Sequence, residues 1–181
     1  VVVEPVVITP TETPSVPSTA NFARPFAVSA GSGDPGVVET SEGVISSGQT
    51  WYPYGESYKG GVRVAVGQLD SDPGYEIITA PGPGGGPHIK IFNEHGQLED
   101  EFFAYDMDFR GGVAIAASDV DGNGIDEILT APGIGHDPVV KFHRKSGALM
   151  NTVSLGDEGW GNLIISSGDL DGDGADDVVV T

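Results

Sequence analysis

Apolar and polar residues alternate along much of the chain, in short runs separated by glycine and proline. In the run at residues 62–69, Val62, Val64 and Val66 share one side, because alternate residues of a strand point to the same face. Further β-prone runs follow at residues 76–80, 88–92 and 99–105. No window shows the helical period of apolar residues. The pattern therefore predicts an all-β protein built from short strands.

The turns between these runs are marked by glycine and proline. The chain holds 28 Gly and 13 Pro in 181 residues, which favours tight turns over long helices. The segment at residues 81–87 reads Pro-Gly-Pro-Gly-Gly-Gly-Pro, and residues 93–96 read Asn-Glu-His-Gly. Such segments are typical of hairpin connections. Four consecutive antiparallel strands are expected in residues 62–105.

The same pattern recurs after about 50 residues. Residues 58–66 resemble residues 109–117, and Ala-Pro-Gly at 80–82 returns at 131–133. Four strands per unit of this length is the arithmetic of a β-propeller blade, so the predicted fold is about 3.5 propeller-type blades in tandem. The predicted organisation is an arm and linker at residues 1–20 and a repeat domain at 21–181, divided into units 21–59, 60–110, 111–160 and 161–181.

The arm and linker have two parts. Residues 1–8 are rich in valine, and residues 10–19 read as an extended Pro/Thr/Ser linker. The valines are either the sticky end of a linker or a strand that pairs with an exposed sheet edge. The chain starts at Val1 without a signal-peptide pattern, which is expected of a mature product or an excerpt.

Three acidic loops recur within the repeat. We call residues 68–76 acidic loop 1, residues 119–127 acidic loop 2 and residues 169–177 acidic loop 3. Each offers oxygen ligands at every second residue, from side chains or a backbone carbonyl, and precedes β-prone residues, a pattern that suits the six to eight oxygen ligands of calcium. In loop 3 the expected ligands are the side chains of Asp169, Asp171, Asp173 and Asp177 and the backbone carbonyl of Ala175. The expected positions in the other loops are Asp119, Asp121, Asn123, Ile125 and Glu127, and Asp70, Asp72, Gly74 and Glu76.

Two other interpretations fit the acidic loops less well. An EF-hand would need a bidentate glutamate at its twelfth position and flanking helices, but Thr130 and Val180 stand there and the flanks are strand-like. An acidic surface turn needs no metal, yet three loops at a near-constant period favour metal. Loop 1 is the weakest, because Gln68 replaces the leading aspartate and Pro73-Gly74 shifts the glycine.

These motifs resemble a known repeat family. The order Gly-Gly-Val-x-Val-Ala, an Asp-rich loop, and Ile-Ile-Thr-Ala-Pro-Gly is similar to the FG-GAP/VCBS-type repeats of bacterial surface proteins, and more distantly to the integrin alpha-subunit propeller. The resemblance covers residues 21–181. It implies an extracellular propeller with calcium on the first loop of each blade, serving adhesion or ligand display. Gln68 departs from the family pattern, which weakens the expectation for loop 1.

Charge and composition narrow the class of partner. A formal net charge of −19 disfavours nucleic acid and anionic membranes. No segment approaches the roughly twenty apolar residues of a membrane helix. The chain has no cysteine, so no disulfide can staple the fold. Calcium can stabilise it instead where calcium is plentiful, which predicts an extracellular or cell-surface location.

Other motifs give weaker signals. The glycines at 82–86 precede a strand rather than a helix, so a structural turn is expected and not a phosphate cradle. His88, His95, His136 and His143 share no ligand spacing. The aromatic group at 51, 52 and 54 recurs at 102, 103 and 105, which favours a core between blades over a sugar-stacking platform. Asp106 and Asp108 are the candidate carboxylate pair, but they lack counterparts in the preceding unit, and no enzyme is predicted.

The first and last predicted units are incomplete, so the predicted blades do not by themselves form a closed propeller. A closed propeller has four to eight blades, so the chain is either an excerpt of a longer propeller or is covered by other copies of itself. The predicted function is a calcium-binding structural or adhesive module that presents loops to a glycan or protein partner. One alternative is a self-assembling filament or lattice subunit with the arm as an inter-subunit strand. A second is a fragment of a polysaccharide-processing enzyme.

Overall fold

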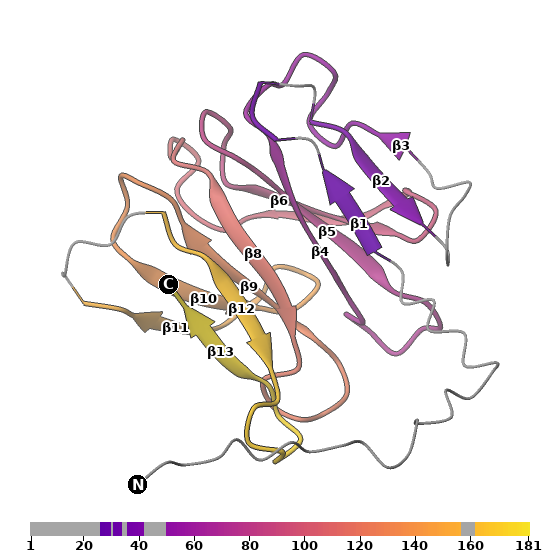
Figure 1. Cartoon of the computed structure of the whole chain (residues 1–181), viewed down its shortest axis with the longest axis vertical. Coiled ribbons are helices and arrows are strands. Elements are labelled where there is room, and N and C mark those ends of the chain that lie inside the picture. The colour runs from indigo at the N-terminus through magenta and orange to yellow at the C-terminus, as the bar shows by residue number, and fades with distance from the viewer. Residues whose placement is uncertain (1–25, 30, 34–35, 42–49, 157–161) are drawn as a thin grey trace, which may run out of the picture.

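The computed structural model describes residues 26–29, 31–33, 36–41, 50–156 and 162–181. Within these residues it is all-β, with thirteen strands and no helix (Figure 1). Consistent with this, the described residues contain no helix that could span a membrane. The arm and linker at residues 1–20, to which both hypotheses for the valines apply, lie outside the described residues.

Two complete four-stranded antiparallel sheets form the centre of the described structure. The sheet of the second unit has the order β4-β5-β6-β7, and that of the third unit has the order β11-β10-β9-β8. The bounds are β4 Val62–Gly67, β5 Glu76–Pro81, β6 His88–Asn93, β7 Leu98–Phe103, β8 Val113–Ser118, β9 Glu127–Pro132, β10 Val139–His143 and β11 Leu149–Ser154. The antiparallel four-stranded sheets predicted from the alternation are therefore present, each in sequence order.

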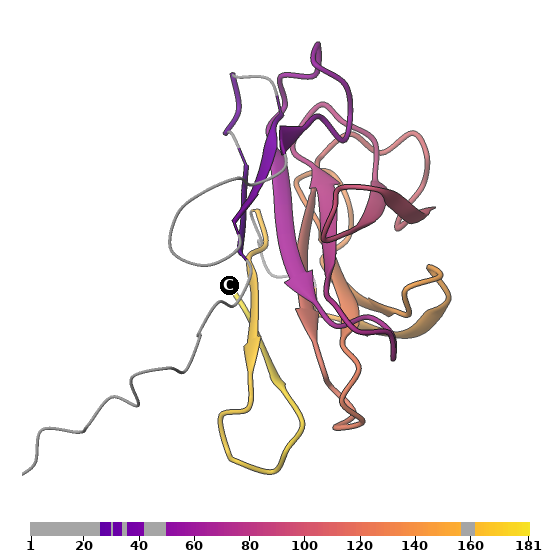
Figure 2. The same cartoon turned by 90° about the vertical axis from the view of Figure 1, so that its right-hand side faces the viewer.

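Two smaller sheets flank them. The first unit contributes β1 Phe26–Ser29, β2 Val38–Ser41 and β3 Thr50–Trp51 in one three-stranded sheet. The fourth unit contributes β12 Ile165–Gly168 and β13 Asp177–Val180 as an antiparallel pair. The described sheets stand side by side and do not close into a barrel (Figures 1 and 2).

The second strand of each complete unit is buried along its whole length. β5 reads Glu-Ile-Ile-Thr-Ala-Pro and β9 reads Glu-Ile-Leu-Thr-Ala-Pro, and all six residues of each are buried. A strand that is covered on both faces needs no alternation of apolar and polar residues. These two strands therefore read as continuous apolar runs, while the outer strands β7 and β11 are largely exposed.

Successive residues of these strands belong to different cores. Ile77 packs with Val38 and Val62, towards the first unit, whereas Ile78 packs with Val113 and Ile128, towards the third. The same division follows one unit later, where Ile128 and Leu129 belong to separate clusters. Because successive side chains of a strand point to opposite faces, each sheet is a layer between two cores. The cores thus join neighbouring units.

The inner strands bring the units together. β4 lies against both β1 and β8, and β12 lies against β8. A paired glycine motif permits close backbone approach beside these strands. The amide of Gly82 donates to the carbonyl of Gly61 at 2.9 Å, and a Cβ atom on Gly82 would overlap the carbonyl oxygen of Gly60. Gly133 repeats both features with Gly112 and Gly111.

Candidate metal-binding loops

The three acidic loops connect the first and second strands of successive units, β4 to β5, β8 to β9 and β12 to β13. All three lie along the same edge of the row of sheets, which faces downward in Figure 1, with loop 1 higher in the view than loops 2 and 3. Backbone hydrogen bonds set them next to one another. The amide of Asp126 in loop 2 donates to the carbonyl of Gln68 in loop 1 at 2.7 Å. The amide of Asp176 in loop 3 donates to the carbonyl of Asp119 in loop 2 at 2.8 Å.

Loop 2 gathers three carboxylates around one point. Asp119, Asp121 and Glu127 each offer an oxygen, and these oxygens lie within 4.8 Å of one another. Backbone amides fix the first carboxylate, because both oxygens of Asp119 accept hydrogen bonds, from Asn123 at 3.0 Å and from Gly124 at 2.7 Å. Gly124 has a φ of 87°, a conformation that glycine adopts without a steric penalty. The turn chemistry of the sequence thus positions the acidic cluster.

Loop 3 repeats this geometry. Oxygens of Asp169, Asp171 and Asp177 again lie within 4.8 Å of one another. Asp169 accepts from the amides of Gly172 at 2.7 Å and Gly174 at 3.2 Å. Both clusters are partly open to solvent, and a divalent cation could reach them without rearrangement of a core.

The ninth residue of each loop has a common role. Its carboxylate accepts a hydrogen bond from the amide of the second residue, which closes the loop onto itself. The pairs are Leu69 to Glu76 at 2.7 Å, Val120 to Glu127 at 3.2 Å and Leu170 to Asp177 at 3.1 Å. Each of these carboxylates keeps a second oxygen for another partner.

The fifth position of loops 2 and 3 is hydrogen-bonded to the seventh. The side-chain oxygen of Asn123 accepts from the amide of Ile125 at 2.8 Å, and that of Asp173 accepts from Ala175 at 2.9 Å. Of the five ligand positions expected in each loop, the structure brings three carboxylates together. The ligand roles of Asn123, Ile125, Asp173 and Ala175 stay predictions.

Loop 1 is organised differently. The side-chain amide of Gln68 donates to the carbonyls of Asp70 at 2.8 Å and Asp72 at 2.7 Å. The ammonium of Lys145, from the turn between β10 and β11, lies 2.6 Å from Asp70, 3.2 Å from Glu76 and 2.7 Å from Glu99. Gly74 has a φ of 132°. In this loop a lysine of the next unit contacts two of the predicted metal ligands.

The pKa values of one carboxylate in loop 2 and one in loop 1 are shifted in opposite directions. Burial, and next the neighbouring charge of Asp121, raise the pKa of Glu127 in loop 2. A bound cation would reverse this effect by favouring the ionised form. In loop 1 the hydrogen bond from Lys145 lowers the pKa of Asp70. Partial burial opposes the charge on Lys145, but its hydrogen bonds to Asp70, Glu99 and Glu76 outweigh burial and raise its pKa.

Several residues of this edge were not identified from the sequence. Lys145 and Glu99 lie far from loop 1 in sequence. The signal that could have identified Lys145 is the change from a negative charge at Glu94 to a positive charge at the equivalent turn position of the next unit. Asp126 and Asp176 both stand at the eighth loop position, and this recurrence was a second available signal. Each carboxylate accepts a hydrogen bond from the preceding unit, Asp126 from the amide of Gln68 at 2.8 Å and Asp176 from the hydroxyl of Ser118 at 3.1 Å.

The recurrent aromatic residues divide into core and surface. The hydroxyl of Tyr105 donates to the carbonyl of Thr130 at 2.9 Å, as that of Tyr54 does to Thr79. Both tyrosines therefore join one unit to the next, as the core hypothesis predicted. Trp51 and Phe102 likewise pack on the following unit, at ring distances of 5.5 Å to Phe92 and 4.9 Å to His143. Tyr52 and Phe103, by contrast, are exposed.

The candidate catalytic carboxylates lie away from the acidic edge. Asp106 and Asp108 are exposed and belong to the connection between β7 and β8, where the amide of Phe109 donates to the carbonyl of Asp106 at 2.9 Å. Of the histidines, His143 is buried, His88 contacts Glu101 at 3.1 Å, and His95 and His136 are exposed. They come from different turns and strands.

Comparisons with known proteins identify no family and show a likeness to a solved structure. No family model matches the chain and no curated protein matches it, so the resemblance to FG-GAP/VCBS-type repeats rests on the motifs alone. The crystal structure of the V. cholerae biofilm matrix protein Bap1 is similar, with 21% sequence identity and a TM-score of 0.43. The match covers 85% of this chain and 30% of that chain. At this TM-score the likeness carries no functional argument.

Proposed function

We propose that this chain is a calcium-stabilised, non-catalytic module of propeller-type repeat units with a structural or adhesive role outside the cell. The observation that carries the proposal is the repeated geometry of loops 2 and 3. Each brings three carboxylates within 4.8 Å, held by backbone amides in the same pattern, on one edge of the molecule. Repetition in register is expected of a site that the fold preserves unit by unit.

The chemistry of the donors favours calcium. Every oxygen available in loops 2 and 3 belongs to a carboxylate, an amide or a backbone carbonyl, and neither loop contains histidine. Hard oxygen ligands suit calcium or magnesium rather than zinc or copper. A flexible nine-residue loop suits the variable geometry of calcium better than the strict octahedron of magnesium. High extracellular calcium would keep such exposed sites filled, which supports an extracellular location.

The arrangement of sheets supports the propeller hypothesis. In a propeller, four-stranded sheets stand side by side with their first strands innermost. Here the first strands β4, β8 and β12 of successive units follow one another, β1 of the first unit lies beside β4, and apolar cores fill the space between successive sheets. The inner strand that would complete the first unit is not among the described residues, so closure of a ring stays part of the proposal.

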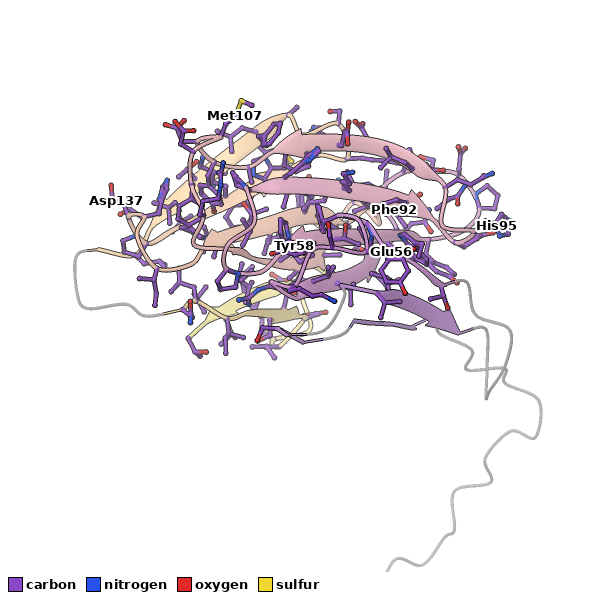
Figure 3. All side chains as sticks on the ribbon, turned by 90° about the horizontal axis from the view of Figure 1, so that it is seen from above. Glu56, Tyr58, Phe92, His95, Met107 and Asp137 are labelled. Atoms are coloured by element: carbon purple, nitrogen blue, oxygen red, sulfur yellow. The ribbon has the colours of Figure 1, made fainter. Side chains whose placement is uncertain are left out.

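The edge opposite the acidic loops is the proposed display surface. Met107 and Ile134, in turns at that edge, are 62% and 68% exposed. Figure 3 shows Met107 and Asp137 at one end of the molecule and His95 at the other. Exposed apolar side chains among polar neighbours are typical of contact surfaces. A glycan or a surface protein is the proposed partner.

Calcium titration tests the metal sites. We expect calcium to raise the melting temperature, and a chelator to lower it, because ligands that bind only the folded state stabilise it by mass action. The double variant Asp119→Asn, Asp169→Asn should lose most of this response. The double variant Asp106→Asn, Asp108→Asn removes the same charge from exposed positions outside the loops and should keep it. An identical melting temperature of the wild type in calcium and in chelator would reject the metal role.

Turnover assays test the non-catalytic role. Incubation with a panel of acidic and neutral polysaccharides should release no new reducing ends. Binding to the same polysaccharides, measured by sedimentation, should depend on the display surface and weaken in the variant Met107→Asp, Ile134→Asp. Catalytic cleavage of any member of the panel would favour the enzyme alternative.

A specific observation favours self-association as a second candidate. Both complete units have an exposed outer strand, but β7 carries Glu99, Asp100 and Glu101 whereas β11 carries no charged residue. Charges on an edge strand prevent pairing with other edges. On β11, Leu149 is 56% exposed and Val153 is 42% exposed. The filament alternative therefore has a defined edge on which another copy of the chain could add.

A further inference from the structure

The ammonium group of Lys145 lies among the carboxylates of acidic loop 1. Its nitrogen is within 3.2 Å of oxygens from Asp70, Glu76 and Glu99. Glu76 is the ninth residue of loop 1 and is 6% exposed. Its equivalents in loops 2 and 3, Glu127 and Asp177, belong to the three-carboxylate clusters. Lys145 thus contacts the carboxylate that corresponds to a cluster member in the other two loops.

We propose that acidic loop 1 is a lysine-filled counterpart of the metal loops, in which Lys145 is the resident cation and a divalent ion is not taken up. The lysine supplies the positive charge that the clustered carboxylates require. It also ties the third unit to the second, because it projects from the turn between β10 and β11. Loop 1 is therefore a metal-independent tether, while loops 2 and 3 depend on metal.

Gln68 is a second, independent observation that points the same way. Its side-chain nitrogen donates to the carbonyls of Asp70 and Asp72. In loops 2 and 3 the first position is an aspartate whose oxygens accept from amides of the same loop. A donor at that position takes up backbone oxygens and offers no negative charge. Loop 1 therefore has a resident cation, and only two of the three positions that form the clusters in loops 2 and 3 carry a carboxylate in loop 1.

The turn that carries Lys145 differs in charge from the equivalent turn of the second unit and packs against that unit. The equivalent turn of the second unit has Glu94 in place of Lys145, with Phe92 and Gly96 equivalent to His143 and Gly147. Gly147, with a φ of 77°, packs against the ring of Phe102 and so holds the lysine turn on the second unit. An open cavity of about 540 Å³ surrounds the ion pairs, lined in part by Asp72, Glu94 and Lys145. The lysine is the cation of this otherwise acidic cavity.

Chelator experiments separate this tether from the metal sites. In excess chelator, Lys145→Met should lower the equilibrium constant for folding about tenfold, because removal of one partner leaves clustered carboxylates without a counter-charge. Lys59→Met removes an exposed lysine outside the loops and should change that constant less than twofold. If Lys145→Met and Lys59→Met are equally stable in chelator, the tether does not exist.

Counting the bound ions tests the proposal that loop 1 takes up no divalent ion. Of the two tests, only the ion count rests on the proposed calcium-binding function. Equilibrium dialysis against calcium, followed by elemental analysis, should find two ions in the wild type and none in the double variant Asp119→Asn, Asp169→Asn. The variant Gln68→Asp, Lys145→Met should bind one ion more than the wild type, and calcium should restore its stability. An ion that remains in Asp119→Asn, Asp169→Asn and disappears with Asp70→Asn would overturn the proposal. A wild type that binds no calcium would reject the proposed metal function, while the chelator comparison would still decide the tether.

Discussion

The second and third units share a skeleton and differ in their charges. Their first and second strands pair in the same register, with Val62 opposite Pro81 in one and Val113 opposite Pro132 in the other. The same tyrosine bond and the same glycine contacts recur in both. Yet Gln68 stands where Asp119 follows, and Glu94 stands where Lys145 follows. The comparison teaches that the repeat preserves the positions that join units, while its loops and turns diverge chemically.

The largest expected effect tests the shared skeleton. Gly82→Ala and Gly133→Ala should each destabilise the protein by about 3 kcal/mol, because the new methyl group overlaps a backbone carbonyl that cannot move away easily. Urea denaturation measures both. Gly168→Ala is the control, since a Cβ there meets no atom within 4 Å and its φ is not in the left-handed region. A clear difference between the two test variants would break the equivalence of the units.

A smaller loss is expected at the tyrosine bonds. Tyr54→Phe and Tyr105→Phe should each cost about 1 kcal/mol, because the hydrogen bond to a threonine carbonyl of the next unit is lost. The single hydroxyl proton of Tyr54 lies between two carbonyls, that of Thr79 at 2.9 Å and that of His88 at 2.7 Å, and it can be donated fully to only one of them. The two variants should therefore lose similar amounts of stability. Thermal unfolding in calcium measures both losses, and a loss near zero for either variant would show that its hydroxyl does not help to join the units.

A pH-dependent difference is expected at His143, which replaces Phe92 of the second unit. Burial lowers the pKa of His143 below its ordinary value of 6.5. As the pH falls, His143 of the unfolded chain therefore binds its proton at a higher pH than His143 of the folded chain. The free energy of unfolding should decrease as the pH drops from 6.5 towards the pKa of the folded state. His143→Phe should flatten this part of the profile, whereas exposed His95→Gln should not. Denaturation at several pH values in chelator, without metal linkage, checks the slope.

The smallest effect on stability is expected at the outer strands. Val153→Lys should change the free energy of unfolding by about 0.5 kcal/mol or less, because the residue is exposed. It should nevertheless reduce self-association, since it places a charged residue on the edge strand β11, where β7 already carries Glu99, Asp100 and Glu101. Light scattering over a concentration series compares it with Glu101→Lys on β7. Equal masses for the wild type and both variants at every concentration would reject β11 as an association edge.

The strands were predictable because their signals are local. Alternation in β4 and β8, the apolar runs of β5 and β9, and the glycine turns between them all lie within a few residues. The predicted bounds of 62–69 and 76–80 agree with Val62–Gly67 and Glu76–Pro81 to within two residues. The carboxylate clusters of loops 2 and 3 were predictable for the same reason, since each comes from one nine-residue segment.

The lysine tether was not predictable, because its partners are distant in sequence. Lys145 is 75 residues from Asp70 and 46 residues from Glu99. Only the side-by-side placement of units brings the turn of one to the loop of another. Likewise, the sequence favoured a core position for all the recurring aromatic residues and did not separate exposed Phe103 from buried Tyr105, because β7 ends at Phe103 and the alternation of strand faces does not extend to Tyr105.

The backbone bonds between the acidic loops give the row of units a direction. Each loop offers a carbonyl at its first residue and an amide at its eighth, so that Asp176 reaches back to Asp119 and Asp126 reaches back to Gln68. A unit excised at the boundaries of the sequence repeat would therefore carry one free acceptor at its trailing side and one free donor at its leading side. Tandem duplicates of the third unit should dock in one order and not in the reverse. Engineers who wish to lengthen this protein should join whole units head to tail and preserve the eighth loop residue.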